Sequence, residues 1–444
     1  MLSTELAARV AASWRQLSAP PREVRVGLSG GLDSSVLTHV LGGLRSALGI
    51  ELSAVHVSHG LVAGSEAWGD VCAELCAALD VPFTVCPVEV DRAHPCGLEA
   101  AAREARRTAL LRGLDRGVLA LAHHRDDQAE TILFRALRGS GVKGLAGMRD
   151  SVDVGAAARI WRPLLDIPRQ LLHDYALRHG LRWIDDPSNA DTAFTRNFLR
   201  NTILPQLDAR FTGASANLAR LGRLAGEAEG LLEELADGDL ELLSLAGGTR
   251  LSYPPALALS SARLRNVLRR LLGQAGLPMP DENRLREVER QFRESGAASG
   301  SRIPLGKVAL CVYRQHWWLE AATLLVGAVE SRSWRGEASV PWCGGVLDFT
   351  PVVGQGLAAD LLKSAACALQ SRHPSARMRL HAGGPSRSLK NLWQEAGVPP
   401  WLRDAVPMLW VDGRLAWIAG VGVAAEFQCP SGQAGILPRW SVFA

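Results

Sequence analysis

The chain has 444 residues, more than one ordinary domain holds, so we expect two or three domains. Apolar residues make up 47% and charged residues 21%, as in globular proteins with full cores, and no apolar run approaches the roughly 18 residues of a membrane span. The net charge is only +4, and eight cysteines without a CxxC pair argue against a zinc–thiolate site and favour free thiols in the reducing cytoplasm.

The first half of the sequence alternates between two kinds of segment. Short apolar runs rich in Val, typical of buried parallel strands, are separated by segments with helical periodicity. This order predicts an α/β fold with a doubly wound parallel sheet, whose ligands bind at the carboxyl ends of the strands. The predicted strands cover residues 23–28, 51–58, 83–90 and 117–123, and the predicted helices cover residues 33–47, 63–80, 98–114 and 126–138.

The segment SGGLDSS (29–35) follows the first predicted strand and opens the first of these helices. Its two glycines let the backbone approach an anion closely, and the start of a helix directs N–H groups and a positive dipole end toward it. Asp33 is the unusual member, because a carboxylate beside phosphates needs a cation such as Mg²⁺ between them. The segment therefore predicts a phosphate loop, and a plain glycine turn is the weaker interpretation.

A second polar cluster, AHHRDDQAE (122–130), follows the fourth predicted strand. His123 and His124 end that strand, and Asp126, Asp127 and Glu130 lie in the first turns of the next helix, whose dipole favours carboxylates. Taken singly, each histidine is explained as a strand-end cap or a core imidazole, and each acid as a solvated residue in the first turn of a helix. Because the cluster lies at the sheet edge that carries the phosphate loop, the residues together predict a site.

The pattern changes near residue 214. Six leucines between residues 218 and 235 form one stripe of an amphipathic helix, the kind of stripe that faces a core, and further helical segments follow. Beyond about residue 300, strand-like segments dominate and nine of the 13 tryptophans occur; these either stack on bases or, as we favour, fill a core. We expect a catalytic domain at residues 1–213, a mainly helical domain at 214–325 and a small mixed α/β domain at 326–444.

Basic residues are concentrated in two stretches. Residues 103–149 hold ten basic and five acidic side chains, and residues 362–403 hold seven and one. Such an excess suits a polyanion such as nucleic acid, although an arginine-rich solvated surface would give the same counts. Arg196 and Arg200, four residues apart on a helix, face one way, either toward RNA phosphate or a bound nucleotide, or toward the nearby Asp185, Asp186 and Asp191.

These motifs carry a resemblance to known proteins. SGGLDS resembles the pyrophosphate loop of the N-type ATP pyrophosphatases, whose sheet is of the adenine nucleotide α-hydrolase-like type. Segments 98–110, 122–145 and 161–207, the last with DDPSN and RNFLR, are similar to the tRNA(Ile)-lysidine synthetase family, and segment 388–410 resembles its terminal domain. The resemblance covers nearly the whole chain, more weakly in the middle. One departure is Ser386-Arg387-Ser388 before Lys390, where the family usually has more basic residues.

The resemblance implies a ligase with a defined substrate. ATP adenylates O2 of the wobble cytidine (position 34) in the isoleucine tRNA with a CAU anticodon. Free L-lysine then displaces AMP at C2, giving lysidine and switching decoding from AUG to AUA. It also implies a cytoplasmic enzyme that forms a homodimer and does not bind membranes. In such an enzyme, residues 214–325 are expected to guide the tRNA and residues 326–444 to bind it.

The resemblance also implies roles for individual residues. Asp127 either shares the Mg²⁺ or, like Asp126 and Glu130, takes a proton from the lysine ammonium, whose reference pKa is about 10.4. ATP is expected at Ser29, Gly30, Gly31, Leu32, Asp33, Ser34 and Arg103, and Mg²⁺ at Asp33 and Asp127. Catalysis is expected of Asp33, Asp126, Asp127, Glu130 and His124, and tRNA contacts of Arg106, Arg196, Asn197, Arg200, Lys390 and Arg403.

Other functions are built on the same loop. A tRNA thiolase usually needs reactive cysteines or a CxxC cluster beside the site, and the sequence has no such cluster. A glutamine-dependent amidating ligase needs a glutaminase domain with its own nucleophile, for which no motif occurs. An RNA-binding protein on an inactive ATPase fold is an alternative of another class, and the intact Asp33 and acidic cluster argue against it.

Overall fold

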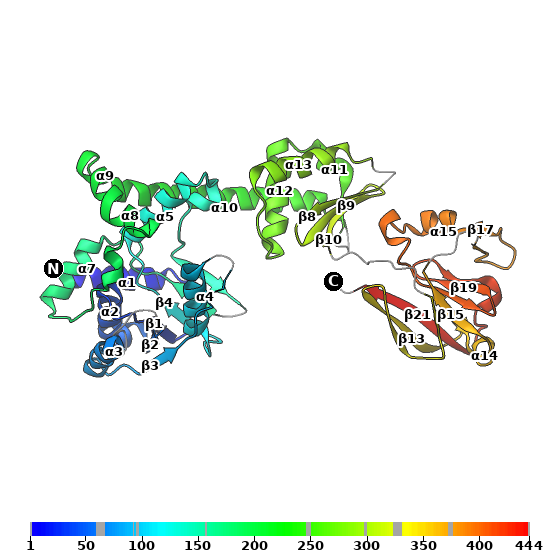
Figure 1. Ribbon diagram of the computed structural model, residues 1–444, viewed down its shortest axis with the longest axis horizontal. Coiled ribbons are helices and arrows are strands. Elements are labelled where there is room, and N and C mark those ends of the chain that lie inside the picture. The colour runs from blue at the N-terminus through cyan, green and yellow to red at the C-terminus, as the bar shows by residue number, and fades with distance from the viewer. Residues whose placement is uncertain are drawn as a thin grey trace. The chain divides into compact units, whose positions relative to one another are not determined.

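The computed structural model divides into two compact units, Met1–Leu231 and Leu232–Ala444 (Figure 1), and each is described by itself. Residues 63–66 of the second predicted helix and Cys96 lie outside the described residues. Within the described residues, no helix combines the length and apolar character needed to cross a membrane. The structure describes residues 2–58, 67–91, 93–94, 97–155, 158–245, 250–296, 300–322, 331–371 and 376–442.

The first unit is built on a six-stranded sheet in the order β3-β2-β1-β4-β6-β5. β5 pairs antiparallel with β6, and the other neighbours pair parallel. The four predicted strands and the doubly wound α/β class are confirmed, with β3 and β4 shorter than expected. The strands are β1 (Glu23–Gly27), β2 (Glu51–Ser58), β3 (Phe83–Pro87), β4 (Val118–Ala120), β5 (Ser151–Val154) and β6 (Ala158–Trp161).

Helices cover both faces of this sheet (Figure 1). On one face, Val24 and Val26 of β1 share an apolar core with α1 (Leu2–Arg15), α2 (Leu32–Leu48), α3 (Ala67–Ala78) and α7 (Arg169–Arg178). On the other face, α4 (Leu98–Leu111) packs through Leu110 in a smaller core with Val55 and Leu119. The chain order reverses between β1 and β4, so the segments after these two strands diverge and leave room for a ligand between them.

Five helices and two irregular turns complete the described part of the unit. They are α5 (Arg125–Leu137), α6 (Val142–Leu145), a 3₁₀ turn η1 (Pro187–Ala190), α8 (Thr195–Phe198), a π-helical segment η2 (Leu199–Ile203), α9 (Leu204–Arg210) and the long α10 (Ala214–Leu243), which continues into the second unit. A π-helical turn is rare and often occurs at functional sites. Here it carries Arg200.

The expected long helix is present as α10, but its leucine stripe does not face a core. Leu221, Leu224, Leu231 and Leu235 are all more than 40% exposed. The packed face instead carries small residues, among them Gly222, where an added Cβ would come within 2.3 Å of Ile132 Cδ1 on α5. α10 and α5 can approach closely here because Gly222 has no side chain. These leucines of α10 lie on its solvent-exposed side.

The second unit begins with the end of α10, α11 (Tyr253–Ala258), α12 (Ser261–Gln274) and α13 (Glu282–Glu294). A four-stranded sheet in the order β7-β10-β9-β8 accompanies these helices and shares their core. This part is therefore less purely helical than expected, because alternating apolar residues after 300 form strands against the same helices. The strands are β7 (Leu251–Ser252), β8 (Ser301–Leu305), β9 (Val308–Tyr313) and β10 (His316–Ala321).

The C-terminal part of the chain consists mostly of strands. One sheet has the order β11-β15-β18-β19-β20, another has the order β12-β13-β21-β14, and β16 pairs with β17. Five of the nine late tryptophans, including Trp317 and Trp342, are buried, so the core interpretation holds for most of them. Beside α14 (Ala359–Leu362) and α15 (Leu389–Ala396), the strands are β11 (Ser331–Ser333), β12 (Ser339–Trp342), β13 (Gly345–Val353), β14 (Leu357–Ala358), β15 (Cys367–Gln370), β16 (Arg377–Met378), β17 (Arg387–Ser388), β18 (Met408–Val411), β19 (Arg414–Ile418), β20 (Gly422–Val423) and β21 (Ala434–Val442).

Candidate active site

The predicted phosphate loop connects β1 to α2. Gly30 has φ +86°, a conformation that only glycine adopts without strain, and an added Cβ there would come within 3.1 Å of Ile184 and 3.3 Å of Cys72. Ser34 Oγ accepts the N–H of Ser29 at 3.1 Å and donates to the Gly31 carbonyl at 3.0 Å, which holds the turn. Leu32 and Asp33 begin α2, so their N–H groups have no intrahelical partner. The loop has the shape and the donors of an anion cradle.

The acidic cluster lies on the first turns of α5, as predicted. His124 is the residue before the helix: its Nδ1 accepts the N–H of Asp127 at 3.3 Å, and Asp127 Oδ2 accepts the N–H of His124 at 3.1 Å. This reciprocal cap satisfies two donors that a helix start leaves unpaired. It also fixes both side chains at the carboxyl edge of the sheet, next to the phosphate loop.

His124 lies at the centre of three carboxylates. Its Nε2 is 3.6 Å from Asp33 Oδ2 and 3.4 Å from Asp127 Oδ2, and its Nδ1 is 3.6 Å from Asp126 Oδ2. Burial alone would lower the pKa of His124, but the carboxylates of Asp126, Asp33 and Asp127 outweigh burial and raise the pKa to about 10. Two predicted regions that are about 90 residues apart in the sequence therefore meet through one imidazole.

His123, the neighbouring residue, has the opposite character. Its Nδ1 is buried and has no hydrogen-bond partner among the described residues. Burial lowers the pKa of His123 to about 4, even though the charge of Asp127 acts in the other direction. The two neighbouring imidazoles therefore have pKa values shifted in opposite directions, downward for His123 and upward for His124.

Asp33 has the chemistry expected of a ligand for Mg²⁺. Its Oδ1 atom is buried without a hydrogen-bond partner among the described residues; Arg169 Nε lies 3.9 Å from Oδ1, and His124 Nε2 lies 3.6 Å from Oδ2. A buried carboxylate oxygen without a donor is costly unless a cation binds it, and Mg²⁺ prefers oxygen ligands. The residues present therefore fit the expected metal.

Glu130 and Asp127 bind two arginines that come from the segment after residue 195. Arg200 Nε is 2.5 Å from Glu130 Oε1, and its NH2 is 2.7 Å from Asp127 Oδ1. Arg196 Nε is 2.8 Å from Glu130 Oε2. Arg196 and Arg200 do face one way, as predicted, but they face Glu130 and Asp127 and not Asp185, Asp186 or Asp191. The pairing joins α5 to the helices that follow the sheet.

Asn197 lies on a different side of the same segment. Its amide nitrogen donates to the carbonyls of Ser188 and Asp191, at 2.8 and 2.9 Å. Asn201 does the same to the Asn189 carbonyl at 2.8 Å. In this structure the amide nitrogen of Asn197 therefore holds the η1 turn in place.

A cavity of about 240 Å³ opens beside the phosphate loop. Arg106 of α4 is among the residues that line it, together with the loop itself, Trp68 and the η1 residue Asn189. Such a mixed apolar and polar hollow at the carboxyl ends of β1 and β2 suits a nucleoside. Arg103 lies on α4 as well, exposed and outside the lining of this cavity.

The cysteine nearest the loop is not a nucleophile. Cys72 of α3 is 1% exposed, and its Sγ lies 3.7 Å from His56 Nδ1. Burial, with a smaller contribution from Cys76, raises the pKa of the Cys72 thiol to about 12. Reactive cysteines need a lowered pKa and some exposure. The chemistry expected of a thiolase is therefore absent from Cys72.

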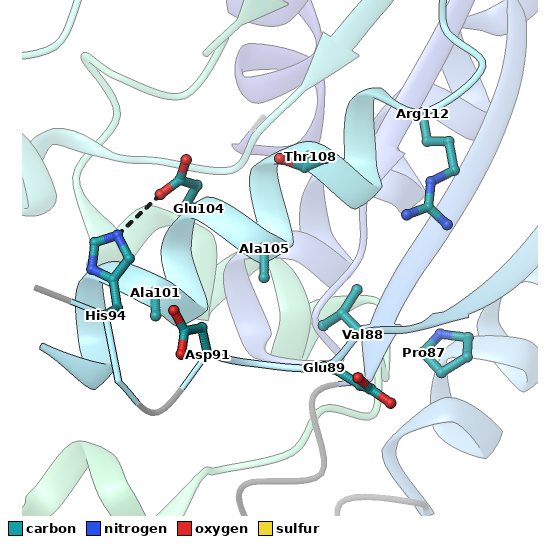
Figure 2. Close-up of a pocket in the computed structure, with 10 residues that line it drawn as sticks. All are labelled: Pro87, Val88, Glu89, Asp91, His94, Ala101, Glu104, Ala105, Thr108 and Arg112. Atoms are coloured by element: carbon teal, nitrogen blue, oxygen red, sulfur yellow. Dashed lines mark ion pairs between the residues drawn. The ribbon is translucent and has the colours of Figure 1, made fainter.

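A second cavity, of about 350 Å³, lies on the opposite face of α4 (Figure 2). Glu89, Asp91 and Glu104 line it, and His94 Nε2 is 3.4 Å from Glu104 Oε2. Ala105 also faces this second cavity, whereas Arg106 faces the first. The predicted site residues do not line it, and the helix separates it from the phosphate loop.

Two predicted tRNA contacts belong to the second unit. Lys390 is exposed on the first turn of α15. Arg403 is partly buried and donates to the Val398 carbonyl at 3.1 Å and to Tyr313 Oη at 3.4 Å. Lys390 is thus free to meet a ligand, while Arg403 is held by its own unit.

Sequence reasoning missed Arg169. Its backbone N–H donates to Asp126 Oδ2 at 2.8 Å and its side chain approaches Asp33, so it touches both halves of the site. Burial would raise the pKa of Asp126, but the hydrogen bond with His124, then the backbone hydrogen bond from Arg169 and the positive charges nearby, outweigh burial and lower the pKa to about 2. Pro168 could have indicated it, because a proline there predicts that a helix begins at Arg169. The segment also lies within residues 161–207, which resemble the family.

Three domain families match this chain: a PP-loop domain over residues 2–207, a TilS substrate binding domain over residues 251–318 and a TilS substrate C-terminal domain over residues 367–440. The chain is 45% identical over 424 residues to the tRNA(Ile)-lysidine synthase of Aromatoleum aromaticum, which covers 95% of this chain and 98% of the relative. It is 43% identical over 423 residues to the enzyme of that name from Azoarcus sp. (95% and 92%) and 36% identical over 425 residues to that from Nitrosomonas europaea (95% and 92%).

Proposed function

Because the chain belongs to the tRNA(Ile)-lysidine synthase family, we propose that it uses ATP to join L-lysine to C2 of the wobble cytidine in the CAU-anticodon isoleucine tRNA. The observation that supports this most directly is the convergence of Asp33 and the α5 acids on His124, beside an anion-binding loop. The product, lysidine, would change decoding from AUG to AUA.

The reaction has two balanced steps. First, cytidine O2 bonds to the α-phosphorus of ATP and the bond to pyrophosphate breaks. Then the lysine ε-nitrogen bonds to C2, the C2–O2 bond breaks, and AMP leaves with that oxygen. The ammonium of lysine must lose protons before and after its attack, so an acceptor is needed close to the nitrogen.

The phosphate loop supplies the binding of ATP. The loop residues Ser29, Gly30, Gly31 and Ser34 surround the phosphates with N–H and hydroxyl donors, and the cavity beside Arg106 holds the nucleoside. Asp33 Oδ1 is the free ligand for Mg²⁺, with Asp127 as its expected partner. When bound, Mg²⁺ neutralises phosphate charge and stabilises the departing pyrophosphate.

The three acids of α5 have different tasks in this proposal. Both oxygens of Glu130 accept from Arg196 and Arg200, so Glu130 positions these arginines rather than accepting a proton. Asp127 is also held, by His124 and Arg200. Asp126 is the most exposed of the three, at 33%, and its Oδ2 takes the contacts with the Arg169 N–H and His124, so Asp126 is the carboxylate best placed to hold the lysine ammonium.

Arg196 and Arg200 each keep N–H donors that the carboxylates do not use, and these donors are available to the substrate. Each guanidinium carries five N–H groups, and the carboxylates use only some of them. Arg196 is 29% and Arg200 32% exposed, so the remaining donors can reach a phosphate of RNA or of ATP.

The test is incorporation of radiolabelled L-lysine into a CAU-anticodon isoleucine tRNA transcript, with ATP and Mg²⁺. Label that requires ATP and intact Asp33 supports the proposal. Release of AMP with another tRNA but not with this one would point to a different PP-loop reaction, such as 2-thiolation. Absence of both signals would favour an RNA-binding protein on an inactive ATPase fold. Light scattering and cell fractionation test the expected homodimer and cytoplasmic location separately.

A further inference from the structure

A large cavity occurs in the C-terminal part of the second unit, and neither Lys390 nor Arg403, the tRNA contacts predicted from the sequence there, lines it. Its volume is about 630 Å³, and it lies between β16, β19 and the turn after β20. This volume falls within the range of pockets that bind small ligands, roughly 300–1,000 Å³. The cavity therefore has room for a nucleotide-sized group.

The floor of the cavity is apolar. Met378, Leu415 and Ala424 line it and are each less than 7% exposed. Trp410 of β18 lines it too and is partly buried. An aromatic side chain among apolar residues is the kind of surface on which a base stacks.

The rim of the cavity is basic. Arg377, Arg379 and Arg414 line it with a single acid, Glu426. Arg414 pairs with Glu426, and Arg377 donates to the Ser386 carbonyl at 2.6 Å. The Arg379 side chain is exposed and has no hydrogen bond or ion pair with any other described residue. One guanidinium at the entrance is thus available for a phosphate.

We propose that this cavity binds one unpaired nucleotide of the RNA substrate, with its base against Trp410 and its phosphate at Arg379. The proposal rests on the proposed function for its RNA. A base inside a double helix is stacked and paired, so it cannot lie flat against Trp410. A single-stranded nucleotide presents a flat base, which matches the apolar floor, and a phosphate, which matches the basic rim.

The test measures binding of two RNA probes to the full-length chain: a single-stranded pentanucleotide and a blunt RNA duplex. Ala382 is exposed and lines the cavity, so Ala382→Trp fills the cavity without changing charge or a buried position. Arg379→Glu reverses the charge at the rim. Arg439→Glu is the matched control, because Arg439 is exposed on β21 of the same part of the chain and does not line the cavity.

We expect Ala382→Trp and Arg379→Glu each to weaken pentanucleotide binding by about tenfold or more, the size of one lost stacking or charged contact. Duplex binding should change by less than about threefold in Ala382→Trp, and Arg439→Glu should change pentanucleotide binding by no more than about threefold. Unchanged pentanucleotide binding in Ala382→Trp overturns the proposal, as does equal weakening by Arg379→Glu and Arg439→Glu.

The outcome is separable from that of the proposed function. Lysine incorporation by the unaltered chain tests the reaction, and pentanucleotide binding tests the cavity. If the chain makes lysidine but Ala382→Trp binds the pentanucleotide normally, the cavity proposal is wrong and the function stands. If the chain makes no lysidine but the two cavity variants lose binding, the cavity stands for another RNA.

Discussion

Asp33 combines a buried, unpartnered oxygen with a position at the start of α2, so a carboxamide there keeps the size of the side chain and removes its charge. Asp33→Asn should lower lysine incorporation by about 100-fold or more, the scale seen when one transition-state stabiliser is removed. Stability should change by less than about 1 kcal/mol. The control is Asp80→Asn, at an exposed acid of the same unit. Full activity of Asp33→Asn, or equal losses in both variants, would exclude the metal role.

Glu130 is 2% exposed and accepts bonds from two arginines, so its role can be separated from proton transfer by measuring stability. Removing one member of a buried ion network leaves charges unpaired and costs about 3–5 kcal/mol. Glu130→Gln should therefore lower the free energy of unfolding in urea by about 3 kcal/mol. Glu104→Gln, at a largely exposed acid, should leave it nearly unchanged. A Glu130→Gln variant of normal stability but low activity would instead make Glu130 a proton acceptor.

The raised pKa of the Cys72 thiol predicts how its labelling by iodoacetamide depends on pH. A thiol with its pKa raised to about 12 is almost entirely protonated below pH 10, and the thiolate is the reactive form. We expect iodoacetamide at pH 8 to label Cys72 at least about tenfold more slowly than the partly exposed Cys86. Raising the pH from 8 to 10 should still leave Cys72 mostly unlabelled in the folded protein. Rapid labelling of Cys72, read by peptide mass spectrometry, would reopen the thiolase interpretation.

At the scale of elements, α10 and α5 make contact at a glycine. A Leu side chain at position 222 would meet Ile132, which is fully buried, so Gly222→Leu should destabilise the protein by about 2 kcal/mol through overpacking. Gly230 lies on the same helix with nothing within 4 Å of an added Cβ. Gly230→Leu should therefore be neutral or stabilise by up to about 1 kcal/mol, because Leu is the better helix former. Equal effects of the two changes on urea unfolding would contradict this packing.

The same contact shows where sequence reasoning stops. Period and composition predicted β1, the phosphate loop and α5, because strands buried on both faces and capped helix starts have strong local signatures. They failed for α10, since a leucine stripe does not reveal whether a partner covers it, and close packing at Gly222 depends on Ile132, 90 residues away in sequence. The partners of Arg196 and Arg200 were missed for the same reason. Nearby acids looked adequate, while the actual ones lie on α5.

At the scale of the whole molecule, the net charge of +4 is small and the arrangement of charge matters more. Lys390 stands on the first turn of α15, where the helix dipole disfavours a cation, so it does not serve to stabilise that helix. An exposed lysine beside the N–H groups of a helix start is well placed for a phosphate. Binding of tRNA through such contacts releases counterions and weakens as salt rises.

Lys390→Ala should therefore reduce the slope of log Kd against log salt for tRNA by about one, roughly the contribution of one phosphate contact. The rate of lysine incorporation at saturating tRNA should not change, because Lys390 takes no part in the chemistry proposed here. Lys363→Ala is the matched control: Lys363 is also exposed but already pairs with Asp360 at 2.7 Å, so this variant should leave the slope as it is. A lower maximal rate with an unchanged slope would show that Lys390 acts on the reaction and not through a phosphate, and the C-terminal part of the chain would then need a role beyond holding RNA.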